Sequence, residues 1–471
     1  MKVVLINPAW NQEVCIPRIN LGLAYIASSL KAKGYEVEIL DQMVEGLSSK
    51  EVCERIQQIS PGIMGFTCNT VQYGFVKETL KRLLNVKRKK RIKIIVGGVH
   101  ATIRPMECIN LPGVDFVIKG EGEAAMIELL QHIDDPHKYH AIKGILYRDE
   151  ESHIVEAADR PFLENLDELP FPSRRLFPKP YWLNNIGIYE TTIQATRGCP
   201  FDCVYCASPK LWKRKVRFRS TKNVVDEMEE VLKEFPDTKS FEFVDDTFTL
   251  KKEYVISLCD EMMKRKLNVK FQAGTRVDFL TANTISKMKR AGLYWIQLGL
   301  ESGDPEILKK AKKQIDLEQV KKAVRLAKSN GIYVELLCQI GLPGETKGTA
   351  EQTIRFAQSL FPDSVCFQLT TPFPGSELCE KATEWGNITT YNYKEYLTVL
   401  PPKFIPKDMT EKELTEIKDY ADKVASKVTM KFAKRTRFIR YKNRLRQVRS
   451  WKEAKEILIK ALRLVKSLVF R

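Results

Sequence analysis

A chain of 471 residues has room for about three domains, and a hydrophobic content of 44% predicts a globular protein. Eleven cysteines over this length exclude a small disulfide scaffold, and no apolar run is long enough to predict a secretory signal or a membrane span. The net charge is +18, but residues 431–471 hold 15 Lys or Arg and 2 Glu, a balance of +13 that leaves +5 for the rest. The basic character therefore belongs to the C-terminal end, and a reducing cytoplasmic setting is expected.

The first 135 residues alternate short buried strands with amphipathic helices. Strands are predicted at 2–7, 35–40, 62–67, 92–96 and 114–118, and helices at 21–33, 52–59, 71–84 and 124–132. Such alternation is typical of a parallel, doubly wound sheet, which binds ligands at the carboxyl ends of its strands. Gly97 and Gly98 follow the fourth strand, where glycine lets the backbone approach a ligand closely.

Residues 136–187 are predicted to be a linker between two domains. A small hairpin is expected from 145–148 and 153–155, turned at 149–152. Five prolines between Pro161 and Pro180 then predict an extended, semi-rigid crossing.

Residues 188–385 resume the alternation and predict a partial TIM-like (β/α)6 barrel. Strands are predicted at 189–195, 240–244, 270–273, 295–298, 332–338 and 364–369, with helices at 223–235, 253–265, 282–291, 317–330 and 349–360. A polar or glycine-rich cluster follows each strand, and in barrels the chemistry lies at the carboxyl ends of the strands.

Cys199, Cys203 and Cys206 follow the first barrel strand in the spacing C-x3-C-x2-C. Thiolates suit zinc or iron–sulfur clusters, but a structural zinc site needs four ligands, and no fourth Cys or His lies nearby. Three thiolates on a [4Fe–4S] cube leave one iron open for another ligand. Buried free cysteines are the plain alternative at this site. Of the scattered cysteines, Cys259 and Cys366 are predicted to be core residues, and Cys338 to lie on a barrel strand where it could face the cavity.

The C-x3-C-x2-C motif resembles that of radical SAM enzymes, and the domain before it resembles the cobalamin-binding, Rossmann-like domain of many such enzymes. The second likeness rests on residues 97–102 and 120–123, which read GGVHAT and GEGE. The resemblance implies that the cysteines bind the cube, that S-adenosylmethionine (SAM) chelates the open iron, and that reductive cleavage yields a 5′-deoxyadenosyl radical. It also implies cobalamin without a protein histidine ligand, because no His precedes His100 and the loop 8–20 holds no D-x-H-x-x-G motif.

The resemblance also assigns binding residues to the two cofactors. The segment 299–303 would lie against the ribose and methionine parts of SAM, and 341–345 near its adenine. Glu301 would hold ribose hydroxyls or the SAM ammonium, and Arg276 its carboxylate, since a guanidinium pairs bidentately. For each carboxylate near these loops, a helix cap or loop role is the alternative. The SAM-binding residues are therefore expected to be Tyr205, Arg276, Gly299, Glu301, Ser302, Gly303, Gly341 and Gly344, and the cobalamin-binding residues Gly97, Gly98 and Thr102.

The implied function is methylation of an unreactive carbon of a small-molecule or lipid-like substrate, with an external one-electron reductant such as flavodoxin or ferredoxin. Relatives that close rings or oxidise, including the anaerobic cyclase of chlorophyll synthesis, keep a second reading open. A third reading, from another class, is a non-catalytic metal-binding protein that docks nucleic acid through its basic end.

Residues 386–471 are predicted to form a helical extension. Thr410 is expected to cap a helix over 410–432, a basic stretch follows at 433–450, and 451–470 form a basic amphipathic helix. The extension could cap the barrel, lie on an anionic membrane at its inner face, or bind RNA. Its regular pattern and few aromatics favour capping first, membrane contact second and nucleic acid least.

Overall fold

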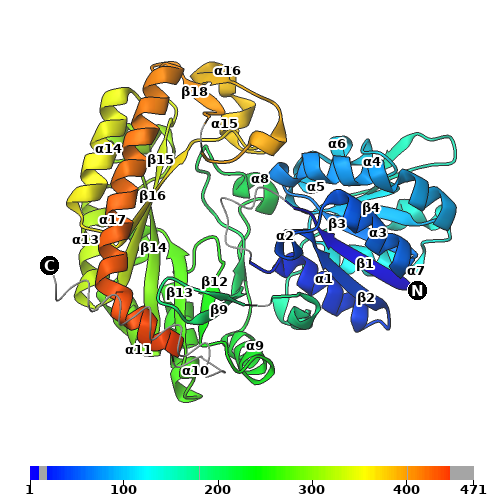
Figure 1. Cartoon of the computed structure of the whole chain (residues 1–471), viewed down its shortest axis with the longest axis horizontal. Coiled ribbons are helices and arrows are strands. Elements are labelled where there is room, and N and C mark those ends of the chain that lie inside the picture. The colour runs from blue at the N-terminus through cyan, green and yellow to red at the C-terminus, as the bar shows by residue number, and fades with distance from the viewer. Residues whose placement is uncertain (10–17, 180, 400, 446–471) are drawn as a thin grey trace.

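The computed structural model describes residues 1–9, 18–179, 181–399 and 401–445. Two α/β bodies lie side by side, one built from the N-terminal part of the chain and one from the middle, and a long C-terminal helix runs along the outer edge of the second body (Figure 1). Within the described ranges, no helix combines the length and the apolar character that crossing a membrane requires.

The first body is a seven-stranded sheet in the order β2-β1-β3-β4-β5-β6-β7. Its strands are β1 (Lys2–Asn7), β2 (Glu36–Asp41), β3 (Ile63–Thr67), β4 (Lys93–Gly97), β5 (Phe116–Ile118), β6 (Ile145–Arg148) and β7 (Ile154–Glu156). The first five are parallel, as predicted. The hairpin β6–β7 forms, but it pairs antiparallel with β5 and so continues this sheet. The sequence predicted the hairpin but placed it in the linker. Hairpin signals in a sequence do not indicate which other strand the hairpin will pair with, so its pairing with β5 was missed.

Helices cover both faces of the first sheet. They are α1 (Leu21–Lys31), α3 (Ser49–Ile59), α4 (Tyr73–Lys90) and α7 (Gly122–Gln131). Val3 and Leu5 of β1 pack into one hydrophobic cluster with α1 and α7, while Val4 and Ile6 pack into another with α3 and α4. Burial on both faces explains why β1 reads as an unbroken apolar run.

The second body is an open, curled sheet in the order β16-β15-β14-β13-β12-β9-β8. Six parallel strands correspond to the six predicted repeats, and β8 (Trp182–Leu183) adds an antiparallel edge. The parallel strands are β9 (Tyr189–Ile193), β12 (Ser240–Phe243), β13 (Lys270–Thr275), β14 (Leu293–Glu301), β15 (Tyr333–Ile340) and β16 (Ser364–Leu369). The helices between them are α9 (Thr221–Glu234), α10 (Lys252–Lys264), α11 (Ala282–Ala291), α13 (Leu317–Ser329) and α14 (Lys347–Ser359).

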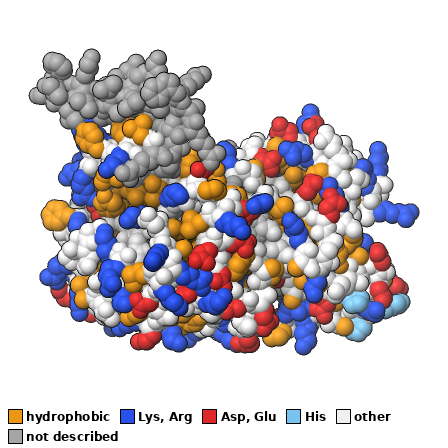
Figure 2. Space-filling model, turned by 90° about the horizontal axis from the view of Figure 1, so that it is seen from below, with side chains coloured by type: hydrophobic (Ala, Val, Ile, Leu, Met, Phe, Trp, Pro, Cys, Tyr) orange, Lys and Arg blue, Asp and Glu red, His pale blue; other side chains and the backbone are white. Residues whose placement is uncertain are grey.

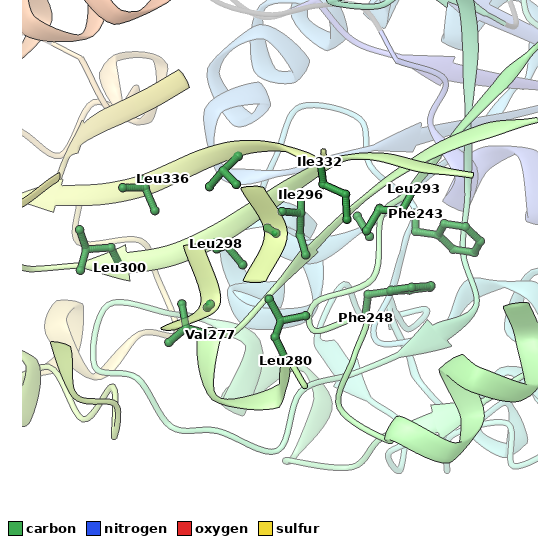
Figure 3. Packing of buried hydrophobic residues seen from close by; sticks show 14 of the residues in the cluster. Phe243, Phe248, Val277, Leu280, Leu293, Ile296, Leu298, Leu300, Ile332 and Leu336 are labelled. Carbon is green, nitrogen blue, oxygen red and sulfur yellow. The ribbon is translucent and has the colours of Figure 1, made fainter. Parts of the chain in front are cut away.

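Side chains alternate between the two faces of this sheet. Ile296, Leu298 and Leu300 of β14 pack beside Leu336 of β15 in the hydrophobic core beneath the helices (Figure 3). Cys338 shares that buried face, so it does not face the concave side of the barrel.

Two of the scattered cysteines were predicted to be core residues. Cys259 is in the core as expected, but the prediction for Cys366 was wrong: it is half-buried and lies near the Glu335 carboxylate. The alternation of β16, which places Cys366 opposite Val365 and Phe367, is the physical reason.

The helix α17 (Glu411–Leu445) packs along the edge strand β16 and against α14. Leu414, Ile417 and Ala421 join the barrel core, so this helix covers the open side of the sheet. Thr410 caps it as predicted: its hydroxyl accepts the Glu413 amide, and the Glu413 carboxylate accepts the Thr410 amide. The helix continues to residue 445 instead of ending at 432, and the amphipathic segment predicted at 451–470 lies outside the described residues.

A short segment of the C-terminal region crosses to the first body. Tyr393 packs its ring 4.9 Å from that of His100, and its hydroxyl donates to Glu107. Lys394 pairs with Glu78 at 3.0 Å. The two bodies are thus joined by the C-terminal region as well as by the linker.

Candidate active site

The three motif cysteines lie in one closed loop at the carboxyl end of β9. The strands β10 (Thr196–Arg197) and β11 (Arg217–Phe218) pair antiparallel and bring the ends of the loop together. At Gly198, φ is +105° and a Cβ would lie 2.0 Å from the Lys215 carbonyl oxygen, so only glycine fits there. The loop is therefore closed at its base before Cys199 begins the motif.

All three cysteines are half-buried free thiols. Cys199 Sγ lies 3.8 Å from Thr247 Oγ1, Cys203 Sγ lies 3.9 Å from the Lys312 carbonyl oxygen, and Cys206 Sγ accepts the Ser208 amide at 3.4 Å. Burial raises the pKa of Cys206 to about 12, and the nearby thiols of Cys203 and Cys199 act in the same direction. Three thiols carried by one closed loop form a donor set of the kind that holds a cube with one open iron.

Asp245 fixes the start of this loop. Its buried carboxylate accepts the Ala195 amide at 3.2 Å, the Thr196 hydroxyl at 2.6 Å and also the Thr196 amide. Burial raises the pKa of Asp245 to about 6. The carboxylate thus ties the end of β12 to the segment before the cysteines, and it does not cap a helix.

Glu301 stands at a bulge where β14 loses its regular pairing with β15. Its φ is +62°, a region that costs a non-glycine residue about 1–3 kcal/mol and that is found at functional sites. Its carboxylate pairs with Lys313 at 2.8 Å and accepts from Gln339 at 3.3 Å. A Cβ on Gly299 would lie 2.6 Å from Glu301 Oε1, so glycine there makes room for the ion pair.

Ser302 and Gly303 bind the loop after β14 to α14. Ser302 is fully buried, with its hydroxyl 3.2 Å from Thr353 Oγ1, and the Gly303 amide donates to the same oxygen at 2.9 Å. A Cβ on Gly303 would lie 2.7 Å from Thr353 Cα. These contacts explain both residues by packing, and their contact with SAM stays a prediction.

Arg276 connects the end of β13 to the cysteine loop. It pairs with Asp278 at 3.0 Å, donates to the Gln314 carbonyl at 3.1 Å, and lies 3.8 Å over the ring of Phe201. Its buried Nη1 has no hydrogen-bond partner among the described residues, which leaves a donor for a ligand carboxylate. Tyr205 packs beside Leu342, which belongs to the loop after β15.

The loop after β15 is held by its own carboxylate. Gly341 and Gly344 have φ of +91° and +74°, and the fully buried Glu345 accepts the amides of Gly341 and Leu342. Burial raises the pKa of Glu345 to about 8, and its Oε1 has no hydrogen-bond partner within the described part of the chain. The loop shape is thus set by a buried acid that the sequence motif contains but that was not predicted as a site residue.

A cavity of about 280 Å³ opens at the carboxyl edge of the first sheet. Its lining includes residues of β1, β3, β4 and β5, and so it extends from the point between β1 and β3 where the strand order reverses and where doubly wound sheets bind ligands. Gly97, Gly98 and Thr102, whose contact with cobalamin stays a prediction, line it together with residues of both bodies. The residues from the first body include Leu5, Tyr25, Gly65, Ile118, Glu121, Gly122, Glu123 and Met126, and those from the second body include Gln194, Arg197, Leu211, Trp212 and Val244.

The walls of this cavity are mostly apolar, and glycines on them let a ligand approach the backbone closely. Gly98 has φ of +101°, and a Cβ there would lie 2.9 Å from the Cys68 carbonyl oxygen. Thr102 donates to the Gly98 carbonyl and accepts the Gly120 amide, both at 2.9 Å, and so joins the two glycine loops. No histidine is found among the described lining residues. His100 is fully buried with Nδ1 3.2 Å from Thr70 Oγ1.

The cavity wall and the cysteine loop meet in a buried ionic cluster. Arg197 pairs with Glu121 and with Glu123, each at 2.7 Å, and Arg217 pairs with Glu121 at 2.7 Å. The side chains of all four residues are at most 10% exposed. Glycines mark residues 120–123 in the sequence and cysteines mark residues 199–206, but no sequence pattern indicates that Glu121 and Glu123 pair with arginines more than 70 residues away.

A half-barrel with a three-cysteine loop, placed against a doubly wound domain with a glycine-lined cavity, defines a radical SAM enzyme with a cobalamin-binding domain. Residues 193–357 match the radical SAM superfamily, and residues 18–130 match the B12 binding domain. The chain is 31% identical over 408 residues to an uncharacterized methyltransferase of Pyrococcus horikoshii, covering 85% of this chain and 87% of that protein. It therefore belongs to the family of cobalamin-dependent radical SAM enzymes, whose cofactors are a [4Fe–4S] cluster, SAM and cobalamin.

Two further comparisons agree with this assignment. The chain is 30% identical over 411 residues to the anaerobic magnesium-protoporphyrin IX monomethyl ester cyclase of Rubrivivax gelatinosus, covering 85% of this chain and 73% of that one. Its fold is similar to that of the radical SAM methyltransferase TsrM from Kitasatospora setae, with a TM-score of 0.70, 18% identity and 89% of both chains covered.

Replacing Cys203 by Ala should abolish iron binding and SAM cleavage together, because two thiolates remain where a cube with one open iron needs three. Iron and sulfide per chain after anaerobic reconstitution measure the first effect, and 5′-deoxyadenosine formation measures the second. Cys379→Ala, which removes a partly buried thiol outside the motif, should keep both. Full iron content in the Cys203→Ala protein would contradict the assignment.

Replacing Glu345 by Gln should reduce the loss of stability at alkaline pH. Between the ordinary glutamate pKa and about 8, the folded protein holds a proton that the unfolded chain has released, so stability falls as pH rises through this window. Glutamine keeps the acceptor oxygen and carries no charge. The thermal midpoint of cofactor-free protein at about pH 6 and about pH 9 measures the effect. As a control, Glu318→Gln at an exposed position should show the same pH dependence of the thermal midpoint as the wild type. If Glu345→Gln also shows the wild-type pH dependence, the explanation is wrong.

Proposed function

We propose that the protein is a methylase that transfers a methyl group to an unactivated carbon of a small-molecule substrate. The observation that carries this proposal is the cavity at the carboxyl edge of the first sheet, whose wall includes Arg197, two residues before Cys199. A corrin bound there would lie beside the cluster and its SAM. When bound, the cluster with SAM supplies hydrogen abstraction, and cobalamin supplies the methyl group.

The residues of this chain would bind and orient the cluster and SAM, and they would exclude water from the site. Cys199, Cys203 and Cys206 would hold the cube, and the free Nη1 of Arg276 would donate to the SAM carboxylate. Glu301, held by Lys313, would accept from the SAM ammonium or ribose hydroxyls. Gly341 and Gly344 would let the loop after β15 approach the adenine. Tyr205 would close the side of the site next to Leu342.

A second candidate function is ring closure or oxidation without net methyl transfer. It is favoured by the 30% identity to the monomethyl ester cyclase, which is close to the 31% identity to the methyltransferase. The two candidates share every binding residue named above, so the residues do not separate them, but their products do.

Anaerobic reconstitution with iron, sulfide and hydroxocobalamin tests the proposal. We expect about four irons per chain, a corrin absorbance that remains after gel filtration, and both 5′-deoxyadenosine and S-adenosylhomocysteine from SAM under a one-electron reductant such as reduced flavodoxin or ferredoxin. 5′-Deoxyadenosine without S-adenosylhomocysteine would favour the cyclase-like function. A single bound zinc with no product from SAM would contradict both.

We also propose that the basic end of α17 contacts an anionic membrane surface. Lys and Arg are interspersed with Asp and Glu over the face seen in Figure 2, whereas residues 427–445 hold eight Lys or Arg and no acid. Met430, Phe438 and Ile439 on this stretch are 43–55% exposed. Cationic and apolar side chains on one helix are typical of interfacial binding, with about 1 kcal/mol from each Lys or Arg near the surface.

Sedimentation with vesicles tests this membrane contact. The full chain should bind vesicles with phosphatidylserine, bind neutral vesicles less, and be released by salt, because the attraction is screened. The double substitution Lys431→Glu/Lys434→Glu should weaken binding by about tenfold or more, while Lys31→Glu on α1 should not. Equal binding to neutral vesicles, or none to anionic ones, would contradict the proposal.

A further inference from the structure

The base of the cysteine loop and the wall of the cavity are built from the same side chains. Arg197 lies on β10 and Arg217 on β11, so one arginine stands on each strand of the hairpin that closes the loop. Both pair with the single carboxylate of Glu121 at 2.7 Å, and Arg197 also pairs with Glu123. Glu121 and Glu123 line the cavity, and so does Arg197.

Aromatic rings extend the same contact. The Arg197 guanidinium lies 5.1 Å over the ring of Tyr25, and the Arg217 guanidinium lies 4.7 Å over Phe162 and 5.6 Å over Trp212. All three rings line the cavity. A ligand that fills the cavity therefore touches the residues that orient both arginines.

The charges of Arg197 and Arg217 balance those of Glu121 and Glu123, and the strength of their ion pairs depends on how far water is excluded. Two arginines face two glutamates with little solvent contact. Although burial acts to raise it, the two arginines hold the pKa of Glu121 below its usual value. Attraction between charges grows as water is excluded, so a ligand that closes the cavity strengthens these pairs and tightens the base of the loop.

We propose that this quartet, Glu121, Glu123, Arg197 and Arg217, couples corrin binding in the cavity to cluster binding by the cysteine loop. This inference rests on the proposed function only in taking the cavity to be the corrin site. Arg197 is a positioning residue in this scheme: it acts through Cys199, two residues away, and through Glu121 and Glu123. Because coupling between two sites is reciprocal, the cluster should favour corrin binding by the same factor.

Titration of hydroxocobalamin into anaerobic full-length protein measures the coupling directly. The dissociation constant is determined with and without a reconstituted cluster. In the wild type, the cluster should lower it by about tenfold, within the usual range for coupled sites. Glu121→Gln removes the carboxylate that both arginines share. In this variant the ratio of the dissociation constants without and with the cluster should fall to near one, while the corrin and the cluster each still bind. Glu121→Asp should restore part of the ratio.

Glu227→Gln is the matched control. Glu227 is a buried carboxylate that pairs with Arg174 and Arg219, and it does not line the cavity. This substitution should lower the thermal midpoint but keep the wild-type ratio, which separates a loss of coupling from a loss of stability. If Glu121→Gln does not fold, Arg197→Lys tests the same point, because lysine keeps the charge and loses the two-pronged pairing.

Two results would overturn the inference: a wild-type ratio of one, or an unchanged ratio in Glu121→Gln and in Arg197→Lys. The failure of the proposed function is distinct. A wild type that binds no corrin at all would contradict the corrin site itself, whereas corrin and cluster that bind independently would contradict only the coupling.

Discussion

The pairing of Arg197 with Glu121 and Glu123 is the contact on which the arrangement of the site depends. The first body supplies most of the glycine-lined cavity, and the second body carries the cysteine loop. Buried charges tolerate few geometries, because an unpaired one is costly to bury. The 2.7 Å pairs between the two bodies thus fix the cavity and the loop relative to each other. The crossing segment at Tyr393 and Lys394 supports the same arrangement from the C-terminal side.

Parallel sheets explain why both halves of the site can meet. The polar and glycine-rich segments of each sheet lie at the carboxyl ends of its strands, and the cavity is lined from both sheets. Outside this region, apolar side chains fill both cores, so the site is placed by rigid elements and shaped by short loops. The acids that hold these loops, Asp245 and Glu345, are buried and bonded mainly to backbone amides. They shape the site without needing to touch a ligand.

Much of the fold follows from the sequence, because strands buried on both faces and helices of regular period leave clear patterns. The parallel strands of both sheets, the loop carrying Cys199, Cys203 and Cys206, and the Thr410 cap were all predictable in this way. The partner of the β6–β7 hairpin, the half-exposed Cys366 and the length of α17 were not, since each depends on tertiary contacts. The site was also predictable only in part. Local spacing in the sequence indicated the three cysteines and Gly97–Gly98. No local signal shows that Glu121 pairs with Arg197 and Arg217, or that Ser302 and Gly303 form hydrogen bonds with Thr353.

Electron paramagnetic resonance of protein that holds both cob(II)alamin and the reduced cluster tests the central claim, that the cavity and the cysteine loop form one site. The two unpaired spins are compared with those of protein loaded with either group alone. If the corrin lies in the cavity beside Arg197, the spins should interact, and the spectrum of the doubly loaded protein should be broadened or split relative to the sum of the separate spectra. A spectrum equal to that sum would contradict the claim.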